Sequence, residues 1–296
     1  MKTIDTLIPD IYDLIRSKKE GWFDEQLATA LSSDISVRLR GQLGQGTRQP
    51  TLRMSAMGPR CPRALWYSIH RPELQEPLPA WAEVKFAFGH IIEALAVALA
   101  KAAGHTVEGE QDELRYDGIV GHRDCVIDGC IVDVKSSSSI AFQKFKSGDF
   151  SKSDNFGYLD QLDCYLLASR EDPLVTNKGT GYLFAVDKQL GHMCLYKHEV
   201  TDERERTLKA RIAEYKQIVA LEQPPACTCG TVEGTYGNIQ LDFKASYSPF
   251  KFSCRPNLRG FIGPKGPVYF TKLNKIPLWD GKPLKEIDRN GRHIFH

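Results

Sequence analysis

Long uninterrupted hydrophobic runs are missing from this sequence of 296 residues. Its longest apolar stretch, residues 86–103, is rich in alanine, but His90, Glu93 and Lys101 interrupt it. A membrane-spanning helix needs about 20 mostly apolar residues, so this stretch predicts a packed helix and the sequence indicates no membrane partner. The chain is long enough to bury a full core, as one large domain or two modest ones.

A secretion signal and a disulfide framework are also missing. Residues 1–20 carry Asp5, Asp10 and Asp13 among their apolar residues, which does not fit the charged and then apolar order of a signal peptide. We therefore expect a cytoplasmic protein. The eight cysteines are scattered along a long chain, so free thiols or metal ligands are better interpretations than disulfides.

A strong charge of either sign is absent, and no internal repeat is found. The formal net charge is +2, which is too small to require a nucleic-acid partner, because acidic residues elsewhere can balance a phosphate-binding face. The charge therefore permits a DNA partner without demanding one.

Three segments are expected along the chain. Residues 1–50 predict a helical N-terminal extension that ends in a polar, glycine-containing run at 41–49. Residues 51–225 carry the regular hydrophobic patterns of a core domain, and residues 226–296 are expected to be an irregular C-terminal region that closes on it.

The core pattern predicts an α/β fold with a central mixed sheet flanked by helices. Short β-type runs between 105 and 136, separated by Glu-Gly or Asp-Gly, and two more between 180 and 199 supply the strands. Helical patterns at 81–103, 157–169 and 201–222 surround them.

Asp124, Asp133 and Lys135 are the residues around which a chemical site is expected. Hydrolysis of a phosphodiester needs carboxylates that hold Mg²⁺ or Mn²⁺, and a nearby cation or base that orients water. We expect Asp124 on one strand and Asp133 and Lys135 on the next, two residues apart and therefore on one face. Unpaired charges on such an apolar strand would be costly unless they meet a metal or each other.

The acidic-x-Lys pattern is not specific by itself. It also begins at four other positions, Glu83, Glu214, Asp242 and Asp280. The first two lie in helical pattern and the last two in irregular sequence, without a preceding strand that supplies a second carboxylate. Context therefore favours Asp133.

Two helices flanking the strands offer further polar side chains. His90 and Glu93 follow Gly89 and are one turn apart, so either could reach a metal. Gln161 and Tyr165 are also one turn apart, although Tyr165 could equally be an ordinary half-buried aromatic.

This order of motifs resembles the PD-(D/E)XK nuclease superfamily, in particular the RecB-like and phage lambda-type exonucleases. The resemblance covers roughly residues 51–221 and comprises Gly-x-x-x-Glu on a helix, Asp on a strand, Asp-x-Lys on the next strand, and Gln-x-x-x-Tyr. It implies a restriction-endonuclease-like core and a DNA exonuclease active in recombination, repair or phage DNA processing, with DNA that has a free end as its partner.

The resemblance also implies roles for individual residues. Lys135 would position the attacking water, and Gln161 and Tyr165 would steady the scissile strand. His90 is a weaker candidate, since relatives place their helix ligand four residues after the glycine. The implied ligands of the metal are Glu93, Asp124, Asp133 and the Val134 carbonyl.

A basic and aromatic stretch at residues 51–72 contains Arg60, Arg63 and Trp66. DNA contact and solvated arginines on a helix are equally good interpretations of it.

Some of these nucleases, the CRISPR-associated ones among them, hold a [4Fe-4S] cluster with one early and three late cysteines. The early position fits Cys61, whereas the late ones fall on Ala245, Ser248 and Cys254. Because neither a methyl nor a hydroxyl group replaces a thiolate, we expect no intact cluster. We expect Cys61 and Cys254 to lie close together nevertheless.

Alternatives to this interpretation remain. Cys227 and Cys229 could join Cys61 and Cys254 to hold zinc or a displaced cluster, which would make a zinc-stapled interaction module. The chain could also be an endonuclease of the same fold, or a nuclease-inactive DNA-binding or scaffold protein.

Overall fold

The computed structural model describes residues 2–18, 20–44, 50–264 and 266–294. They form two compact units: unit 1 consists of Met1–Gly58 and Trp81–Ala210, and unit 2 of Pro59–Ala80 and Arg211–His296. The expected boundaries near 50 and 225 do not coincide with these, because residues 59–80 group with the C-terminal part of the chain. Residues 45–49 of the expected polar run lie outside the described residues.

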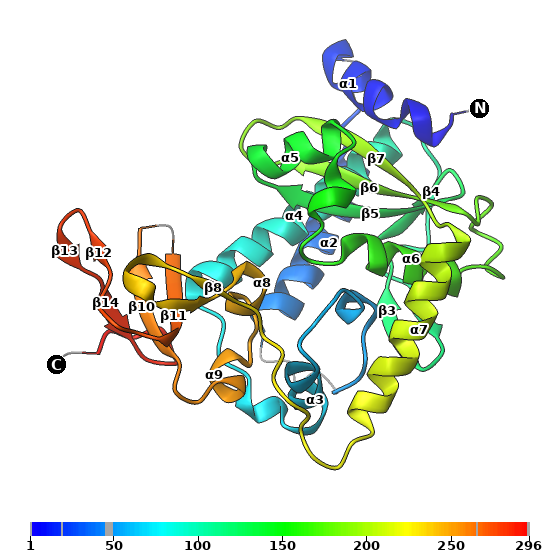
Figure 1. The fold of residues 1–296 in the computed structure, drawn as a ribbon. Coiled ribbons are helices and arrows are strands. Elements are labelled where there is room, and N and C mark those ends of the chain that lie inside the picture. Colours follow the sequence, from blue (N-terminus) through cyan, green and yellow to red (C-terminus); the bar gives the residue numbers. More distant parts are fainter. Residues whose placement is uncertain (1, 19, 45–49, 265, 295–296) are drawn as a thin grey trace. The chain divides into compact units, whose positions relative to one another are not determined.

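Unit 1 contains the elements that position the candidate site (Figure 1). Its helices are α1 (Leu7–Ser17), α2 (Glu25–Leu43), α4 (Ala80–Ala102), α5 (Ser139–Lys146), α6 (Tyr158–Ala168) and the first half of α7 (Asp202–Val219). Its strands are β1 (Val107–Glu108), β2 (Glu113–Tyr116), β3 (Ile119–His122), β4 (Cys125–Ile127), β5 (Cys130–Ser137), β6 (Thr180–Asp187) and β7 (Met193–Glu199). No helix of the described residues is long and apolar enough to cross a membrane.

The central sheet has five strands in the order β1-β4-β5-β6-β7. β5 and β6 are parallel and the other neighbours are antiparallel, which confirms the expected mixed sheet. Apolar residues of α1 and α4 form a core with alternate residues of the sheet, among them Val132, Val134 and Phe184. Helices α5 and α6 contact β5 and β6 as well, so helices flank the sheet as expected.

The turn between β4 and β5 fixes the register of the site. Asp128 and Gly129 both have positive φ angles, of 50° and 77°, as a two-residue hairpin turn of type I′ requires. Ile127 pairs with Cys130 across this turn. Continuing that register places Asp124 opposite Asp133.

Asp124 departs from the expectation in one respect. It was expected on a strand, but Arg123 and Asp124 lie between two separate strands, β3 and β4. The division arises because β3 pairs with β2 in a separate two-stranded sheet, whereas β4 pairs with β1 and β5. Asp124 therefore lies immediately before the central sheet rather than within it.

Unit 2 corrects the prediction of an irregular C-terminal region. It contains a five-stranded sheet in the order β14-β10-β11-β9-β8. Three of its strands have only three residues, and the other two, β10 and β11, contain Gly or Pro, so no clear alternation marks them in the sequence. The strands of unit 2 are β8 (Thr231–Glu233), β9 (Ile239–Leu241), β10 (Arg259–Gly263), β11 (Gly266–Lys272), β12 (Leu278–Trp279), β13 (Lys282–Pro283) and β14 (Lys285–Ile287). β12 and β13 form a separate two-stranded sheet. The helices are α3 (Pro62–His70), the second half of α7, α8 (Phe243–Ser246) and α9 (Lys251–Cys254).

Candidate active site

Asp133 and Lys135 lie two residues apart on β5, at the centre of the sheet of unit 1. Asp133 is 1 % exposed, and its Oδ2 forms an ion pair with the Nζ of Lys135. Burial lowers the pKa of Lys135, but the charges of Asp133 and Asp124 raise it by a larger amount, so the net shift is upward. The ammonium group is therefore protonated at neutral pH.

Asp124 faces β5 from the end of the neighbouring strand. Its Oδ2 accepts a hydrogen bond from the backbone N–H of Val134 at 2.7 Å. The pairing of β4 with β5 ends at Cys125 and Val132, so it does not extend to this N–H group. Burial, together with the charges of Asp133 and Glu93, raises the pKa of the Asp124 carboxyl well above its ordinary value. The three carboxyl groups are thus electrostatically coupled.

Glu93 projects from α4 and is held by two donors that the sequence did not point to. Its Oε1 accepts hydrogen bonds from Arg38 Nη1 and, at 2.7 Å, from Gln111 Nε2. Burial and the charge of Asp133 raise the pKa of Glu93, although Arg38 opposes them. His90 Nδ1 lies 3.9 Å from the other oxygen, Oε2, so His90 is at the margin of the site.

A divalent cation fits the chemistry of this group of oxygens. Asp133 Oδ2 is buried, and no donor among the described residues makes a hydrogen bond of normal geometry to it. Carboxylates whose charges repel one another gain the most from a shared positive charge, and oxygen ligands suit Mg²⁺ and Mn²⁺. The three acidic residues brought together by α4, β5 and the segment before β4 therefore fit the metal that the sequence predicted.

The oxygens of the three carboxylates do not all lie within 4.8 Å of one another. Within the described part of the chain, three or more potential ligand atoms come within 4.8 Å of one another only at a group of four cysteines. At the carboxylates, the cations of Arg38 and Lys135 already neutralise Glu93 and Asp133. Binding of a metal here would replace these ion pairs in part.

Helix α6 brings its own side chains to the same region. Gln161 Nε2 donates a hydrogen bond to Tyr165 Oη at 2.6 Å, and Tyr165 is 2 % exposed. Burial raises the pKa of Tyr165, and the charges of Asp133 and Asp124 raise it further. The phenol is therefore neutral and lies within electrostatic reach of the acidic residues.

Tyr158, at the start of α6, was not predicted from the sequence. The Nζ of Lys135 lies 4.6 Å from the centre of its ring, within the range of a cation–π interaction. The aromatic face therefore helps to fix the ammonium group beside Asp133.

The start of α6 is itself fixed by an unusually close backbone contact. Gly157 has a φ of 76°, and a Cβ atom there would lie 2.5 Å from the Cα of Gly58. The carboxylate of Asp154 accepts hydrogen bonds from the N–H groups of residues 157, 158 and 159. These contacts position Tyr158 relative to the sheet.

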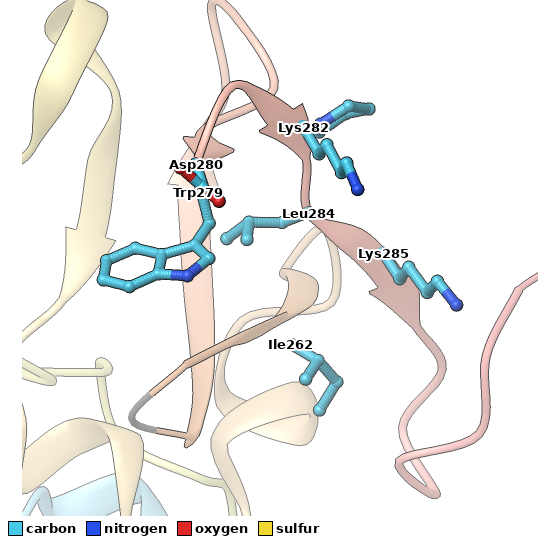
Figure 2. A pocket seen from close by; sticks show the side chains of 7 residues that line it. Ile262, Trp279, Asp280, Lys282, Leu284 and Lys285 are labelled. Carbon is cyan, nitrogen blue, oxygen red and sulfur yellow. The ribbon is translucent and has the colours of Figure 1, made fainter.

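The other acidic-x-Lys positions have ordinary roles. Glu83 lies in α4 and Glu214 in α7, and Asp242 caps α8 by accepting from Ala245 N at 2.7 Å. Asp280 forms the turn between β12 and β13 with a φ of 49°. It lines a hollow in which it is the single acidic residue, and Figure 2 shows Lys282 pointing away from the ring of Trp279.

The residues expected to contact DNA have internal partners in unit 2. Trp66 is buried and donates its indole N–H to Leu221 O at 2.8 Å, so its ring is not presented to bases. Arg63 Nε donates to Pro225 O at 2.6 Å. Arg60 is exposed, and its contact with DNA stays a prediction.

Two of the three late cysteine positions implied by the resemblance hold other residues, Ala245 and Ser248. Ala245 is buried in the apolar cluster around Cys254, and Ser248 Oγ accepts a hydrogen bond from Phe250 N at 3.3 Å. Cys61 and Cys254 do lie close together, and Cys227 and Cys229 join them.

Comparisons with known proteins give only distant similarities. No protein-family model and no curated protein matches the chain. Among solved structures, SSO0001 aligns at 18 % identity and a TM-score of 0.42, over 75 % of this chain and 95 % of its own. An alkaline exonuclease from Laribacter hongkongensis aligns at 16 % identity and a TM-score of 0.41, over 58 % of this chain and 91 % of its own. A phage related exonuclease from Haemophilus somnus aligns at 13 % identity and a TM-score of 0.39, over 58 % of this chain and 94 % of its own. At these values, the function has to be inferred from the residues of the site.

Proposed function

We propose that this chain is a Mg²⁺- or Mn²⁺-dependent deoxyribonuclease that degrades DNA from an end. The observation that carries the proposal is the coupled set of Glu93, Asp124 and Asp133, whose charges act on one another beside the protonated Lys135. A hard divalent cation relieves that repulsion, and cations held in this way are used for phosphodiester hydrolysis.

The ligands would be the three carboxylates and the backbone of β5. In a strand, the N–H and C=O of one residue point to the same side, so the Val134 carbonyl faces the side from which Asp124 accepts the Val134 N–H. When bound, the cation activates a water molecule and neutralises charge on the phosphate. The chain's contribution would be to hold four oxygen ligands around the central strand β5.

Lys135 has the properties of a group that orients water and not of a base. Its raised pKa keeps it charged, and its ion pair with Asp133 and the ring of Tyr158 restrict its position. Tyr165 remains a neutral phenol that accepts from Gln161, so its own O–H is available to donate to a phosphate oxygen. These roles agree with those that the motif order implies.

The test is degradation of end-labelled linear DNA, single- and double-stranded, with Mg²⁺, Mn²⁺ or EDTA. The proposal predicts release of labelled nucleotides that requires metal and is lost in Asp133→Ala. Asp280→Ala is the matched control, because Asp280 also precedes a lysine by two residues but lies in a turn of unit 2. Metal-independent turnover, or equal activity of the two variants, would contradict it.

The choice of an exonuclease depends on the order of the motifs and has its own test. Closed circular DNA should resist the enzyme until a single cut provides an end, whereas an endonuclease would degrade both forms. A nuclease-inactive scaffold would leave linear DNA intact and bind it equally well after Lys135→Ala. The proposed role in recombination, repair or phage DNA processing depends only on the order of the motifs.

A further inference from the structure

Four thiols of unit 2 meet in one place although they come from three distant segments. The Sγ atoms of Cys61, Cys227, Cys229 and Cys254 all lie within 4.8 Å of one another. All four are free thiols, and the 3.9 Å between the sulfurs of Cys61 and Cys227 is far beyond the roughly 2.05 Å of a disulfide bond. Such a convergence is the donor set of a thiolate metal site.

We propose that these four cysteines bind one Zn²⁺ ion that holds unit 2 together. In a tetrahedral site with Zn–S distances of about 2.3 Å, the sulfurs are about 3.8 Å apart, close to the observed separations. A [4Fe-4S] cluster also uses four cysteines, but four irons and four sulfides must then fit between the thiolates, which requires wider spacing. The compact arrangement therefore favours a single ion.

Donor groups surround the sulfur of Cys61. The Sγ atoms of Cys229 and Cys254 lie within 4.8 Å of it, and the backbone N–H of Thr228 donates to it at 3.4 Å. A bound Zn²⁺ would hold all four cysteines as thiolates.

A positive side chain accompanies the cluster. Arg255 directly follows Cys254, and its Nη2 donates to the carbonyl of Cys229 at 3.2 Å. Its Nε is buried and has no hydrogen-bond partner among the described residues. Because Zn²⁺ with four thiolates carries a net charge of −2, a guanidinium beside it is a suitable counter-ion.

The ion would close a long loop in a unit with a small core. Cys61 precedes α3, Cys227 and Cys229 precede β8, and Cys254 ends α9, and 166 positions separate Cys61 from Cys227. The large buried side chains of the apolar cluster around the thiols are Leu241, Phe250 and Leu258. Structural zinc sites supply folding free energy directly, so the ion would hold residues 59–80 to the C-terminal part of the chain.

The proposal is independent of the nuclease site, because soft thiolates select zinc whereas carboxylates select Mg²⁺ or Mn²⁺. The experiment is anaerobic purification of the full chain from cells supplied with both zinc and iron, followed by elemental analysis and assay of acid-labile sulfide. One zinc and little iron per chain are expected. Zinc-edge X-ray absorption should show four sulfur neighbours at about 2.3 Å.

Variants assign the ion to the cluster. Cys227→Ser combined with Cys229→Ser should lose the zinc, whereas Cys194→Ser, which alters a half-buried thiol of β7, should keep it. Stoichiometric iron with sulfide, metal-free protein with four titratable thiols, or a zinc shell containing nitrogen or oxygen would each overturn the proposal. The absorption experiment needs only the unmodified protein, so a variant that fails to fold does not prevent the test.

Discussion

The carboxylate of Asp124 accepts the backbone N–H of Val134 at 2.7 Å, and this bond joins the segment before β4 to the strand that carries Asp133 and Lys135. The bond and the charge of Asp124 have separate consequences. The bond satisfies a strand N–H, whereas the charge is costly in the absence of metal because burial and neighbouring carboxylates raise the pKa of the group. Substitutions can separate these two effects.

Asp124→Asn should keep the hydrogen bond and lose the metal. The Asn side-chain oxygen still accepts from Val134, and removal of a charge whose pKa is raised in the folded state should leave the melting temperature unchanged or higher at pH 7. Nuclease activity should fall at least about 100-fold, since loss of even an outer-shell partner costs metal sites 10- to 100-fold. Calorimetry and the end-labelled DNA assay measure the two effects.

Asp124→Ala is the control for that separation. It also removes the acceptor, so the unpaired Val134 N–H should lower stability by about 1–3 kcal/mol. Equal melting temperatures for the Asn and Ala variants would show that the hydrogen bond contributes nothing.

Arg38→Gln should make the protein more responsive to metal. The side chain of Arg38 is 7 % exposed and pairs with Glu93, whose side chain is 11 % exposed. Removal of one partner of a buried pair costs about 3–5 kcal/mol, so the metal-free variant should melt at a lower temperature. Added Mn²⁺ should then raise its melting temperature more than that of the unmodified protein, since the ion replaces the missing cation.

The control for Arg38 lies on the same helix. Arg40 is exposed, and Arg40→Gln should change neither the melting temperature nor the response to Mn²⁺. If Mn²⁺ stabilises Arg38→Gln no more than Arg40→Gln, Glu93 does not share a site with the cation.

Tyr158 should affect turnover through Lys135. Tyr158→Leu removes the ring that lies 4.6 Å from the ammonium group, and a partly desolvated cation–π contact contributes about 0.5–2 kcal/mol. The expected loss in kcat is therefore about 2- to 30-fold, with little change in KM. Tyr158→Phe keeps the aromatic face and should retain most of the activity, so equal losses in both variants would show that the hydroxyl is the important group.

Gly157→Ala should displace the start of α6. Its Cβ would lie 2.5 Å from the backbone of Gly58, in addition to the cost of about 1–2 kcal/mol for a side chain in the left-handed region. Gly148→Ala is the matched control, because its φ is 79° and nothing lies near its added Cβ. Gly157→Ala should destabilise the protein more and also reduce nuclease activity; equal stability of the two variants would contradict the proposed clash.

The free energy of unfolding at acidic pH should depend on Glu205. Hydrogen bonds from Arg170 and Lys209 lower the pKa of Glu205 to about 2, below the roughly 4.3 of an unfolded glutamate. The contribution of this group is therefore complete above about pH 4.3 and is lost as the pH falls toward 2. Denaturant unfolding should show Glu205→Gln less stable than the unmodified protein at pH 6 and nearly equal to it at pH 2. The neighbouring exposed Glu203→Gln should show no such convergence.

The central part of the site was predictable because it is local in sequence. The Asp128-Gly129 turn determines which residues of β4 and β5 face each other, and the two-residue spacing puts Asp133 and Lys135 on one face. The mixed sheet and its helices also follow from clear hydrophobic periods. Glu93 could be identified because a glycine precedes it on a helix that is itself well defined.

Residues that depend on long-range packing could not be predicted in this way. Arg38 meets Glu93 across 55 positions, and no local pattern distinguishes it from Arg40, the other arginine of α2. Trp66 resembled a DNA-contacting aromatic because its sequence neighbours are basic, whereas its burial depends on the segment near Leu221. The thiol cluster likewise joins Cys61 to a segment 166 positions away.

Binding of Mn²⁺ to the metal-free protein, followed by electron paramagnetic resonance, tests the central claim most directly. The site of Glu93, Asp124 and Asp133 predicts one tightly bound Mn²⁺ per chain in the unmodified protein. It also predicts loss of that ion in Asp133→Asn and its retention in Asp280→Asn. Equal Mn²⁺ binding by the unmodified protein and Asp133→Asn would show that these carboxylates do not form a metal site.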